Sequence, residues 1–506
     1  MRRVATFAAA LLAASLLALA GCGAHAVIDA SAVPSAATLA RVHIPAGDWT
    51  RFDYDAQRSG VGPGDTGLDR HNVGALRLRR VRLPGTVDSS AVELHGVVVG
   101  GRRRDVAIMT TTYGKTLAVD PGTGRLLWVF TPHDIRAYQG SAQITTATPV
   151  IDPDRRSVYA AAPDGRIYKL SVADGREVHS GFWPVSITYD ATHEKVAAAL
   201  NISGSSVVVT TGGYIGDAPP YQGHVVMINR RFGQITGEWN SLCSDRHALF
   251  VPRTCPASDA AIWAREGAVI EPGTGRILVA TGNAPFNGST DWGDSVLELS
   301  PDGRQLLHNW TPTNQAHLNS SDTDVGSTAP AVLPPYHGRR LAVQGGKAGV
   351  LDLLDLGRLD GTTGGAGPRT GGQVFETQSP GSDQVFTAPA VWSHGGRTWV
   401  FVGDGSGTWA YVLTGGAAAP RLSVAWRSGN GGTSPVIAGG LLYVYDPGGA
   451  LDIYLPTTGR RLVSLPAGGG HWNSPIVVGG RVILPVGNAN DHSTSGTLDI
   501  FHLPRH

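Results

Sequence analysis

The residues of this chain that could carry out chemistry are few. Three cysteines occur, and none of them belongs to a C-x-x-C pair, a C-x-x-C-H motif or a zinc-binding spacing. No motif assembles a Ser/His/Asp triad. Lysine occurs only four times against 37 arginines, at Lys115, Lys169, Lys195 and Lys347. In a chain that uses arginine so strongly, each lysine indicates a position that requires a compact ammonium group.

The N-terminus predicts export and a lipid anchor. Arg2 and Arg3 precede an apolar run over 4–20, which has the length of a signal peptide and is short for a spanning helix. The run ends in Leu19-Ala20-Gly21-Cys22, which resembles the bacterial lipobox, where the peptide is cleaved before a cysteine that then receives lipid. An ordinary signal peptide with a chance cysteine is the alternative. We expect a signal peptide over 1–21 and a lipidated Cys22 with a flexible tether over 22–47, attached to the bacterial cell envelope on its periplasmic or extracellular face.

Two cysteines remain once Cys22 is assigned to lipid. An even pair in an exported protein indicates a disulfide, and Cys243 and Cys255 lack the context of a redox site. The sequence therefore predicts a Cys243–Cys255 bridge on the loop over 240–258. In the chain-entropy model such a bridge stabilises the fold by about 3 kcal/mol.

Composition limits both the fold and the partners. The formal net charge is +1, which does not indicate a nucleic-acid partner. Only 16% of the residues are charged and 68 of the 506 are glycine, while the apolar runs are short. This combination is typical of short strands joined by tight turns.

A repeat of roughly 40 to 50 residues organises the chain, as in the blades of a β-propeller. One unit has strands over 92–99, 105–112, 115–120 and 125–130, with the turn Asp120-Pro-Gly-Thr-Gly124 between the last two. Small-residue–Pro–apolar triplets open further units and suit an innermost strand. These triplets are Thr148-Pro149-Val150, Ala329-Pro330-Ala331, Ala388-Pro389-Ala390, Ser434-Pro435-Val436 and Ser474-Pro475-Ile476.

Eight such units can be counted, and the last one lacks a strand. The strand over 76–83 has no unit of its own, and a propeller must close without an exposed sheet edge. We therefore expect an all-β fold, an eight-bladed propeller of four-stranded antiparallel blades over 48–506. Its N-terminal strand closes the last blade.

Two features of the chain carry a family resemblance. One is the segment with Asp48-Trp49, Tyr54-Asp55 and Arg58-Ser59-Gly60, and the other is the repeated Asp-x-x-Thr-Gly and apolar-Trp elements. They resemble the N-terminal segment and the pyrroloquinoline-quinone (PQQ) repeats of the quinoprotein alcohol dehydrogenase-like family of propellers. The family includes PQQ-dependent dehydrogenases and a non-enzymatic lipoprotein of the outer-membrane assembly machinery.

The resemblance implies a site at the propeller axis. In the dehydrogenases PQQ lies on a tryptophan with a calcium ion beside it, and an aspartate takes the proton of the alcohol. By position, Trp263 would be the floor, Asn283 a metal ligand and Lys347 the basic contact to the quinone. Asp322 would be a metal ligand or the base, with Asp324 as its neighbour.

Each of these residues also has a structural interpretation. Trp263 could pack between blades, Asn283 could cap a turn, the acids could face solvent and Lys347 could belong to a turn. The family's adjacent cysteine pair is missing. Its metal-binding glutamate has no clear counterpart, and only Asp217 could substitute for it.

Two functions remain open. The first is a binding or scaffold lipoprotein with a degenerate quinoprotein site, holding a small ligand or protein partner at the propeller face or in its channel. The second is a PQQ- and calcium-dependent dehydrogenase of an alcohol, aldehyde or sugar, with a separate electron acceptor. In both cases we expect a monomer attached to the membrane through Cys22.

Overall fold

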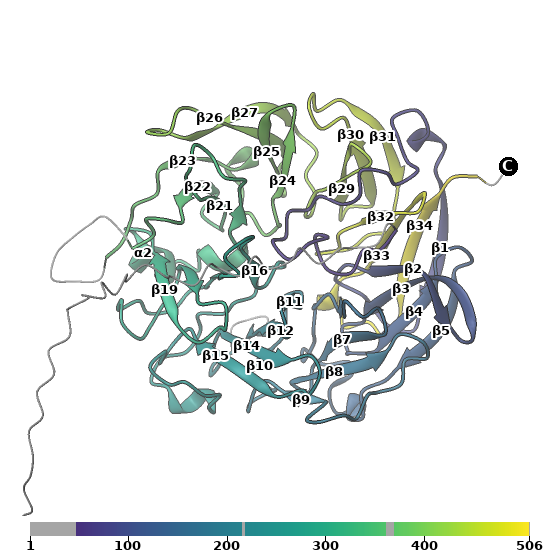
Figure 1. Cartoon of the computed structure of the whole chain (residues 1–506), viewed down its shortest axis with the longest axis horizontal. Coiled ribbons are helices and arrows are strands. Elements are labelled where there is room, and N and C mark those ends of the chain that lie inside the picture. Colours follow the sequence, from purple (N-terminus) through teal and green to yellow (C-terminus); the bar gives the residue numbers. More distant parts are fainter. Residues whose placement is uncertain (1–46, 215–217, 361–368, 505–506) are drawn as a thin grey trace, which may run out of the picture. The chain divides into compact units, whose positions relative to one another are not determined.

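The computed structural model describes residues 47–214, 218–360 and 369–504, which form a ring of eight four-stranded antiparallel sheets (Figure 1). The predicted eight-bladed propeller is therefore confirmed. Cys22, the predicted signal peptide and most of the tether lie outside the described residues, as does Asp217. Within the described residues, no helix combines the length and apolar character needed to span a bilayer.

The strands follow the chain from blade to blade. Blade 1 contains β2 (Val92–Val99), β3 (Arg102–Thr110), β4 (Thr116–Asp120) and β5 (Arg125–Phe130); blade 2 contains β6 (Val150–Ile151), β7 (Ser157–Ala162), β8 (Arg166–Ser171) and β9 (Val185–Ser186); blade 3 contains β11 (Asn201–Ser203), β12 (Ser206–Thr210), β14 (His224–Asn229) and β15 (Ile235–Asn240); blade 4 contains β16 (Val269–Ile270), β17 (Ile277–Ala280), β18 (Val296–Leu299) and β19 (Leu306–Trp310).

The second half of the ring is built in the same way. Blade 5 contains β20 (Ala331–Val332), β21 (Leu341–Gln344), β22 (Val350–Asp355) and β23 (Phe375–Gln378); blade 6 contains β24 (Ala390–His394), β25 (Arg397–Gly403), β26 (Thr408–Thr414) and β27 (Arg421–Ser428); blade 7 contains β28 (Val436–Ala438), β29 (Leu441–Asp446), β30 (Ala450–Tyr454) and β31 (Arg461–Pro466); blade 8 contains β32 (Ile476–Val478), β33 (Arg481–Val486), β34 (Gly496–His502) and β1 (Arg77–Leu83).

The remaining elements are short. They are a two-stranded sheet of β10 (Glu194–Lys195) and β13 (Gly212–Gly213), the helices α1 (Ile135–Tyr138) and α2 (Gln315–Ser320), and 3-10 turns at Val73–Ala75, Pro252–Thr254, Val325–Ser327, Pro380–Ser382 and Ala489–Asp491.

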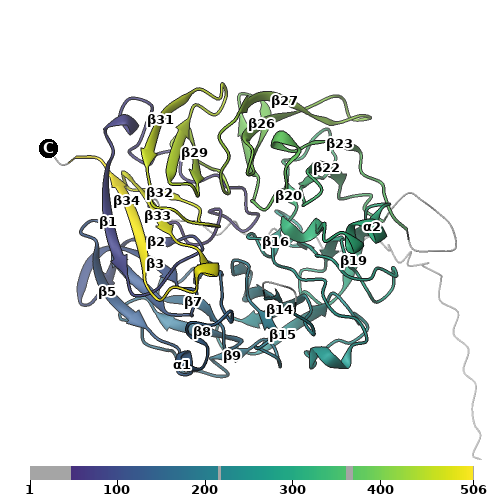
Figure 2. The same ribbon diagram turned by 180° about the vertical axis from the view of Figure 1, so that it is seen from behind.

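Strand β1 closes the ring as predicted. It pairs antiparallel with β34, from Arg77 opposite His502 to Leu83 opposite Gly496. Figures 1 and 2 show the purple β1 beside the yellow β34 from both sides. The first and last parts of the propeller thus share one sheet, which removes the edge that β34 would otherwise expose.

The blades are buried on both faces because their side chains alternate between two neighbours. In β7, Val158 and Ala160 pack into an apolar cluster shared with blade 1. The intervening Tyr159 and Ala161 pack into a cluster shared with blade 3. This explains why the strands read as continuous apolar runs and not as an alternation of apolar and polar residues.

The Pro-containing triplets lie where the sequence places them. Strands β6, β20, β24, β28 and β32 each begin immediately after the proline of a triplet, and each is the first strand of its blade. Proline is tolerated immediately before a strand because no hydrogen bond of the sheet requires a backbone N–H at that position.

The segment over 48–62 crosses the ring and ties five blades together. Backbone hydrogen bonds join it to the first strands of these blades, through N–H groups of Glu93, Ile151, Ile270, Val391 and Ile437 at 2.7–2.9 Å. Arg58, which is 2% exposed, adds bonds from its guanidinium to four backbone carbonyls. This segment therefore lies across the axis and holds the inner ends of the blades in place.

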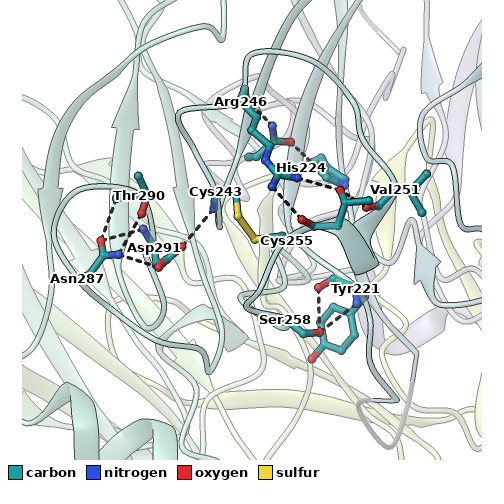
Figure 3. Close-up of a disulfide and its surroundings, with 12 residues drawn as sticks. Tyr221, His224, Cys243, Arg246, Val251, Cys255, Ser258, Asn287, Thr290 and Asp291 are labelled. Atoms are coloured by element: carbon teal, nitrogen blue, oxygen red, sulfur yellow. Dashed lines mark hydrogen bonds between the residues drawn. A yellow bond between two sulfur atoms is a disulfide. The ribbon is translucent and has the colours of Figure 1, made fainter.

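The disulfide between Cys243 and Cys255 is present (Figure 3). It staples the loop between β15 and β16, where Arg246 also donates to the Thr254 hydroxyl and carbonyl at 2.9 and 2.8 Å. Asp291 accepts the N–H of Cys243 at 3.2 Å, which connects the staple to the neighbouring loop.

Candidate functional site

A cavity of about 660 Å³ lies at the centre of the ring. The segments that lead into the first strands of blades 1 to 6 and of blade 8 all contribute to its wall, through Asp88, Thr146, Ala197, Trp263, Asp324, Phe386 and Trp472. Such a volume is typical of a site for a small organic ligand. The described residues that the family resemblance implied also line it: Trp263, Asn283, Asp322, Asp324 and Lys347.

Lys347 is held between two carboxylates. Its ammonium nitrogen lies 2.5 Å from Oδ2 of Asp324 and 2.8 Å from Oδ1 of Asp322. Burial alone would lower the pKa of Lys347, but the two carboxylates outweigh it and the pKa is raised. Lys347 therefore stays charged, and its Nζ lies 5.9 Å from the centre of the Trp263 ring.

The two carboxylates differ in burial, and this separates their roles. The side chain of Asp322 is 73% exposed, whereas that of Asp324 is 10% exposed. Asp324 also accepts the backbone N–H of Asn283 at 2.7 Å, and burial raises its pKa despite the opposing Lys347. The family resemblance implies the metal-binding or proton-accepting role for Asp322, but the geometry favours Asp324 for any role that needs a desolvated carboxylate.

Asn283 presents an amide oxygen without a partner. Its Nδ2 donates to the carbonyl of Leu318 at 3.0 Å and to Asp294 at 3.3 Å, which fixes the orientation of the amide. Its Oδ1 is buried and accepts no hydrogen bond. Asp294 is fully buried behind it, and burial together with Asp324 raises the pKa of Asp294 to about 7.

Gly282 allows this close packing. A Cβ atom at that position would lie 2.5 Å from Oδ1 of Asp324, so a larger residue would push the carboxylate away from the N–H of Asn283. The Gly-Asn pair that looks like a turn in the sequence is therefore needed for the approach of two blades.

Aromatic rings cover another part of the wall. Phe386 lies between Trp263, at 6.0 Å from centre to centre, and Trp472, at 5.2 Å. Tyr214 and Tyr221 line the cavity as well. Aromatic faces beside charged groups suit a flat ligand with polar edges.

Arg265, Phe386 and Asp294 belong to the site although no family motif in the sequence marks them. For Arg265 a signal was present, because Ala261, Trp263 and Arg265 all line the cavity while the intervening Ile262 and Ala264 lie in apolar clusters. This is the two-residue period of an extended chain, and it assigns Arg265 to the same side as Trp263. Phe386 and Asp294 carry no such local mark.

The described residues do not fit a calcium ion. Calcium takes six to eight oxygen ligands, yet among residues 47–214, 218–360 and 369–504 no group of three His, Cys, Asp or Glu side chains could hold a metal. Asn283 offers one free oxygen, and the carboxylates beside it already face the Lys347 ammonium. Asp217, the expected substitute for the missing glutamate, lies outside the described residues.

Glu194 does not replace that glutamate. It pairs in register with Gly213, in the neighbourhood where the ligand was expected, and it is fully buried. Its oxygens accept bonds from Thr188, from the N–H of Gln222 and from His224 at 3.0 Å. The carboxylate is thus saturated by structural contacts and does not line the cavity.

Comparisons with known proteins agree with this fold. Residues 75–246 match the model of a family described as outer membrane protein assembly factor BamB. No curated protein sequence matches the chain. The quinohemoprotein alcohol dehydrogenase of Comamonas testosteroni is similar at a TM-score of 0.64 and 16% identity, over 91% of this chain and 82% of that one.

Two further solved structures are similar in fold. A europium-containing methanol dehydrogenase has a TM-score of 0.64 at 15% identity, over 92% of this chain and 100% of that chain. BamB from Moraxella catarrhalis has a TM-score of 0.51 at 12% identity, over 85% of this chain and 99% of that chain. At such identities the likeness shows the fold alone, and a shared fold does not determine function.

Proposed function

Since this chain is a β-propeller of the PQQ-like, quinoprotein type, we propose that it is a ligand-binding protein of the cell envelope, with its binding site in the axial cavity. The observation that carries the proposal is the convergence of Trp263, Asn283, Asp324 and Lys347 from separate turns on one cavity. A flat ligand of the quinone-cofactor class is the first candidate. Export and attachment through lipid on Cys22 belong to the same proposal and rest on the lipobox-like sequence.

Each residue of the site would make a different contact with a ligand. Trp263 offers a ring face, and Lys347, whose pKa is raised by its two carboxylate neighbours, offers an ammonium group for an electron-rich oxygen at the edge of the ligand. Asn283 offers its free Oδ1 to a donor group. Asp324 holds Lys347 and Asn283 in these orientations, because it bonds to both.

Binding of PQQ tests the proposal. The mature chain in detergent is titrated with PQQ while tryptophan fluorescence is followed, with and without Ca²⁺. We expect saturable quenching that does not depend on Ca²⁺ and that weakens at least about tenfold in Trp263→Leu and Lys347→Ala, by loss of one stacking face or one charged contact.

Matched controls exist in the same chain. Trp409→Leu and Lys169→Ala change residues outside the cavity and should leave the titration unchanged. Absence of quenching at millimolar PQQ, or equal weakening in the control variants, would overturn the quinone-type ligand.

The dehydrogenase is the second candidate, favoured by the pairing of Asp324 with Lys347 beside Asn283. A quinone cofactor would supply hydride acceptance there, and Asp324 would hold the proton of the substrate. Dye-linked oxidation of alcohols, aldehydes or sugars that requires PQQ and Asp324 would establish it over simple binding. A scaffold role with a protein partner rests on the likeness to BamB alone and comes third.

A further inference from the structure

Arg265 is a buried cation that lines the cavity. It is 7% exposed, and its guanidinium carbon lies 5.1 Å from the centre of the Trp472 ring. It thereby connects the segment that leads into blade 4 with the one that leads into blade 8. Stacking on an indole face holds a planar guanidinium in one orientation and leaves its edges free to donate.

The guanidinium makes no hydrogen bond. Its Nε and Nη1 are buried without a hydrogen-bond partner, and it forms no ion pair with a carboxylate of the described residues. The other two buried arginines of the described residues differ from it. Arg51 donates to Asn201 at 2.9 Å, and Arg58 donates to four carbonyls. Burial lowers the pKa of Arg265, and Asp88 and Glu266 counteract this only as neighbouring charges.

Neither acid near Arg265 accepts a hydrogen bond from it. The carboxylate of Asp88 accepts from the His471 ring and the Trp472 backbone N–H at 2.8 Å and from the N–H of Ala489 at 2.9 Å. One oxygen of Glu266 accepts the N–H of Ala329 at 3.2 Å, and its other oxygen is buried without a hydrogen-bond partner. The negative charges of Asp88 and Glu266 lower the cost of burying the Arg265 guanidinium, but neither carboxylate accepts a hydrogen bond from it.

The other cations of the wall have partners. Lys347 lies between Asp322 and Asp324, His471 is bonded to Asp88, and Lys195 stacks over Tyr214. An oxyanion that enters the cavity would therefore find its unused donors at Arg265. A buried donor without a partner is costly, and such costs are typical of positions kept for binding.

We infer that the natural ligand of the cavity is an aromatic oxyanion whose carboxylate or equivalent group binds Arg265. The fork of guanidinium donors matches two oxygens of one carboxylate. Phe386 and Trp472 lie beside it and would contact the ring of the ligand. This inference rests on the proposed function, because it assumes that the cavity is a binding site, and it adds the charge of the ligand and the residue that selects it.

Two probes of equal shape separate charge from shape. Naphthoate carries a carboxylate on a flat ring system, and naphthamide carries an uncharged amide in its place. The mature chain in detergent is titrated calorimetrically with each probe. We expect naphthoate to bind about 10- to 100-fold more tightly than naphthamide, as a charged hydrogen-bond pair provides.

Variants assign the preference to Arg265. In Arg265→Gln the affinity for naphthoate should fall to that of naphthamide, and in Arg265→Lys part of the preference should remain. Arg427→Gln is the matched control, because Arg427 stacks on Trp409 at 4.2 Å outside the cavity and should not alter either affinity. Near-ultraviolet circular dichroism establishes that each variant is folded.

The outcomes distinguish the two proposals. If naphthoate and naphthamide bind equally well, or if folded Arg265→Gln keeps the preference for naphthoate, the inference about Arg265 is overturned while the cavity remains a binding site. If neither probe and no PQQ binds, the proposed function fails with it. The wild-type comparison of the two probes decides the charge preference even where a variant does not fold.

Discussion

At the scale of single residues, the axial site is a set of charges that satisfy one another only in part. Lys347 and Asp324 form a pair that is largely removed from water, while Asp322 on the other side of the ammonium is largely solvated. Removing one member of a buried ion pair destabilises the fold much more than removing one member of an exposed pair. The lysine, and not an arginine, suits this place because its single nitrogen fits between two carboxylates.

Removal of the lysine should therefore destabilise the fold more than removal of its exposed partner. Lys347→Ala leaves the carboxylate of Asp324 without its cation, and we expect a loss of about 1–3 kcal/mol in the free energy of unfolding. Asp322→Ala, the control at the exposed end, should cost under about 1 kcal/mol. Guanidinium denaturation of both variants measures this, and equal losses would contradict the assigned burial.

Glu93 should make the free energy of unfolding depend on pH. It is 1% exposed and bonded to Arg481 at 3.0 Å, and burial, with Asp105 nearby, raises the pKa of Glu93 to about 8. Because the folded state then holds the proton more tightly than the unfolded chain, stability is greatest below the unfolded pKa and declines as pH rises towards 8. We expect the free energy of unfolding of the wild type, relative to Glu93→Gln, to fall between about pH 4.5 and pH 8. Parallel stability profiles for the two proteins would show that Glu93 does not titrate in this range.

At the scale of elements, each blade is specified locally and placed by its neighbours. Strands β2 and β5 have the bounds that the sequence predicts, because turn residues and β-branched runs mark them. The predicted strand over 105–112 is β3, which spans Arg102–Thr110 and so ends before the predicted residue 112. It begins earlier, at Arg102, because the hairpin with β2 extends through three arginines that local hydrophobicity does not mark. Tertiary pairing thus lengthens a strand beyond its apolar part.

The closing strand β1 gives a test at this scale. Leu83 is 1% exposed in the core shared by blades 8, 1 and 7, whereas Leu78 on the same strand is 36% exposed. Leu83→Ala should cost about 2–4 kcal/mol by loss of apolar burial and by the cavity left behind, and Leu78→Ala under about 1 kcal/mol. Urea denaturation measures both, and hydrogen exchange should show faster opening of the β34 amides in Leu83→Ala. A β34 that exchanges at an unchanged rate would argue against closure through β1.

At the scale of the whole molecule, the ring brings turns from distant parts of the chain to one axis. The segment over 48–62 pairs with the first strands of five blades, and the cavity wall is built from the segments that lead into first strands. Because Arg58 bonds to the carbonyl of Glu266, next to Arg265, this crossing segment and the cavity wall support each other. Ligand binding should for this reason stabilise the ring as a unit and not a single blade.

Attachment to the envelope is also a property of the whole protein. If Cys22 receives lipid, the full chain made in a bacterial host should fractionate with membranes and be released by detergent but not by high salt, because acyl chains anchor through apolar burial. Cys22→Ser should appear in the soluble fraction with its ligand binding intact. Membrane association of Cys22→Ser that resists salt would contradict a lipid anchor at this cysteine.

The sequence by itself determined the blades, their number, the closing strand and the Cys243–Cys255 bridge. Each of these follows from local turn chemistry, from apolar runs of strand length, or from the need to cover a sheet edge. Through the family pattern, the sequence also indicated the residues of the axial site, which are Trp263, Asn283, Asp322, Asp324 and Lys347.

Only the tertiary structure decided how these side chains are used. It placed Asp324 and not Asp322 in the interior, and it left Arg265 without a hydrogen bond beside Trp472. The physical reason is that burial and pairing at the axis depend on side chains from several blades at once. Their distances are set when the ring closes, and no local pattern in the chain contains them.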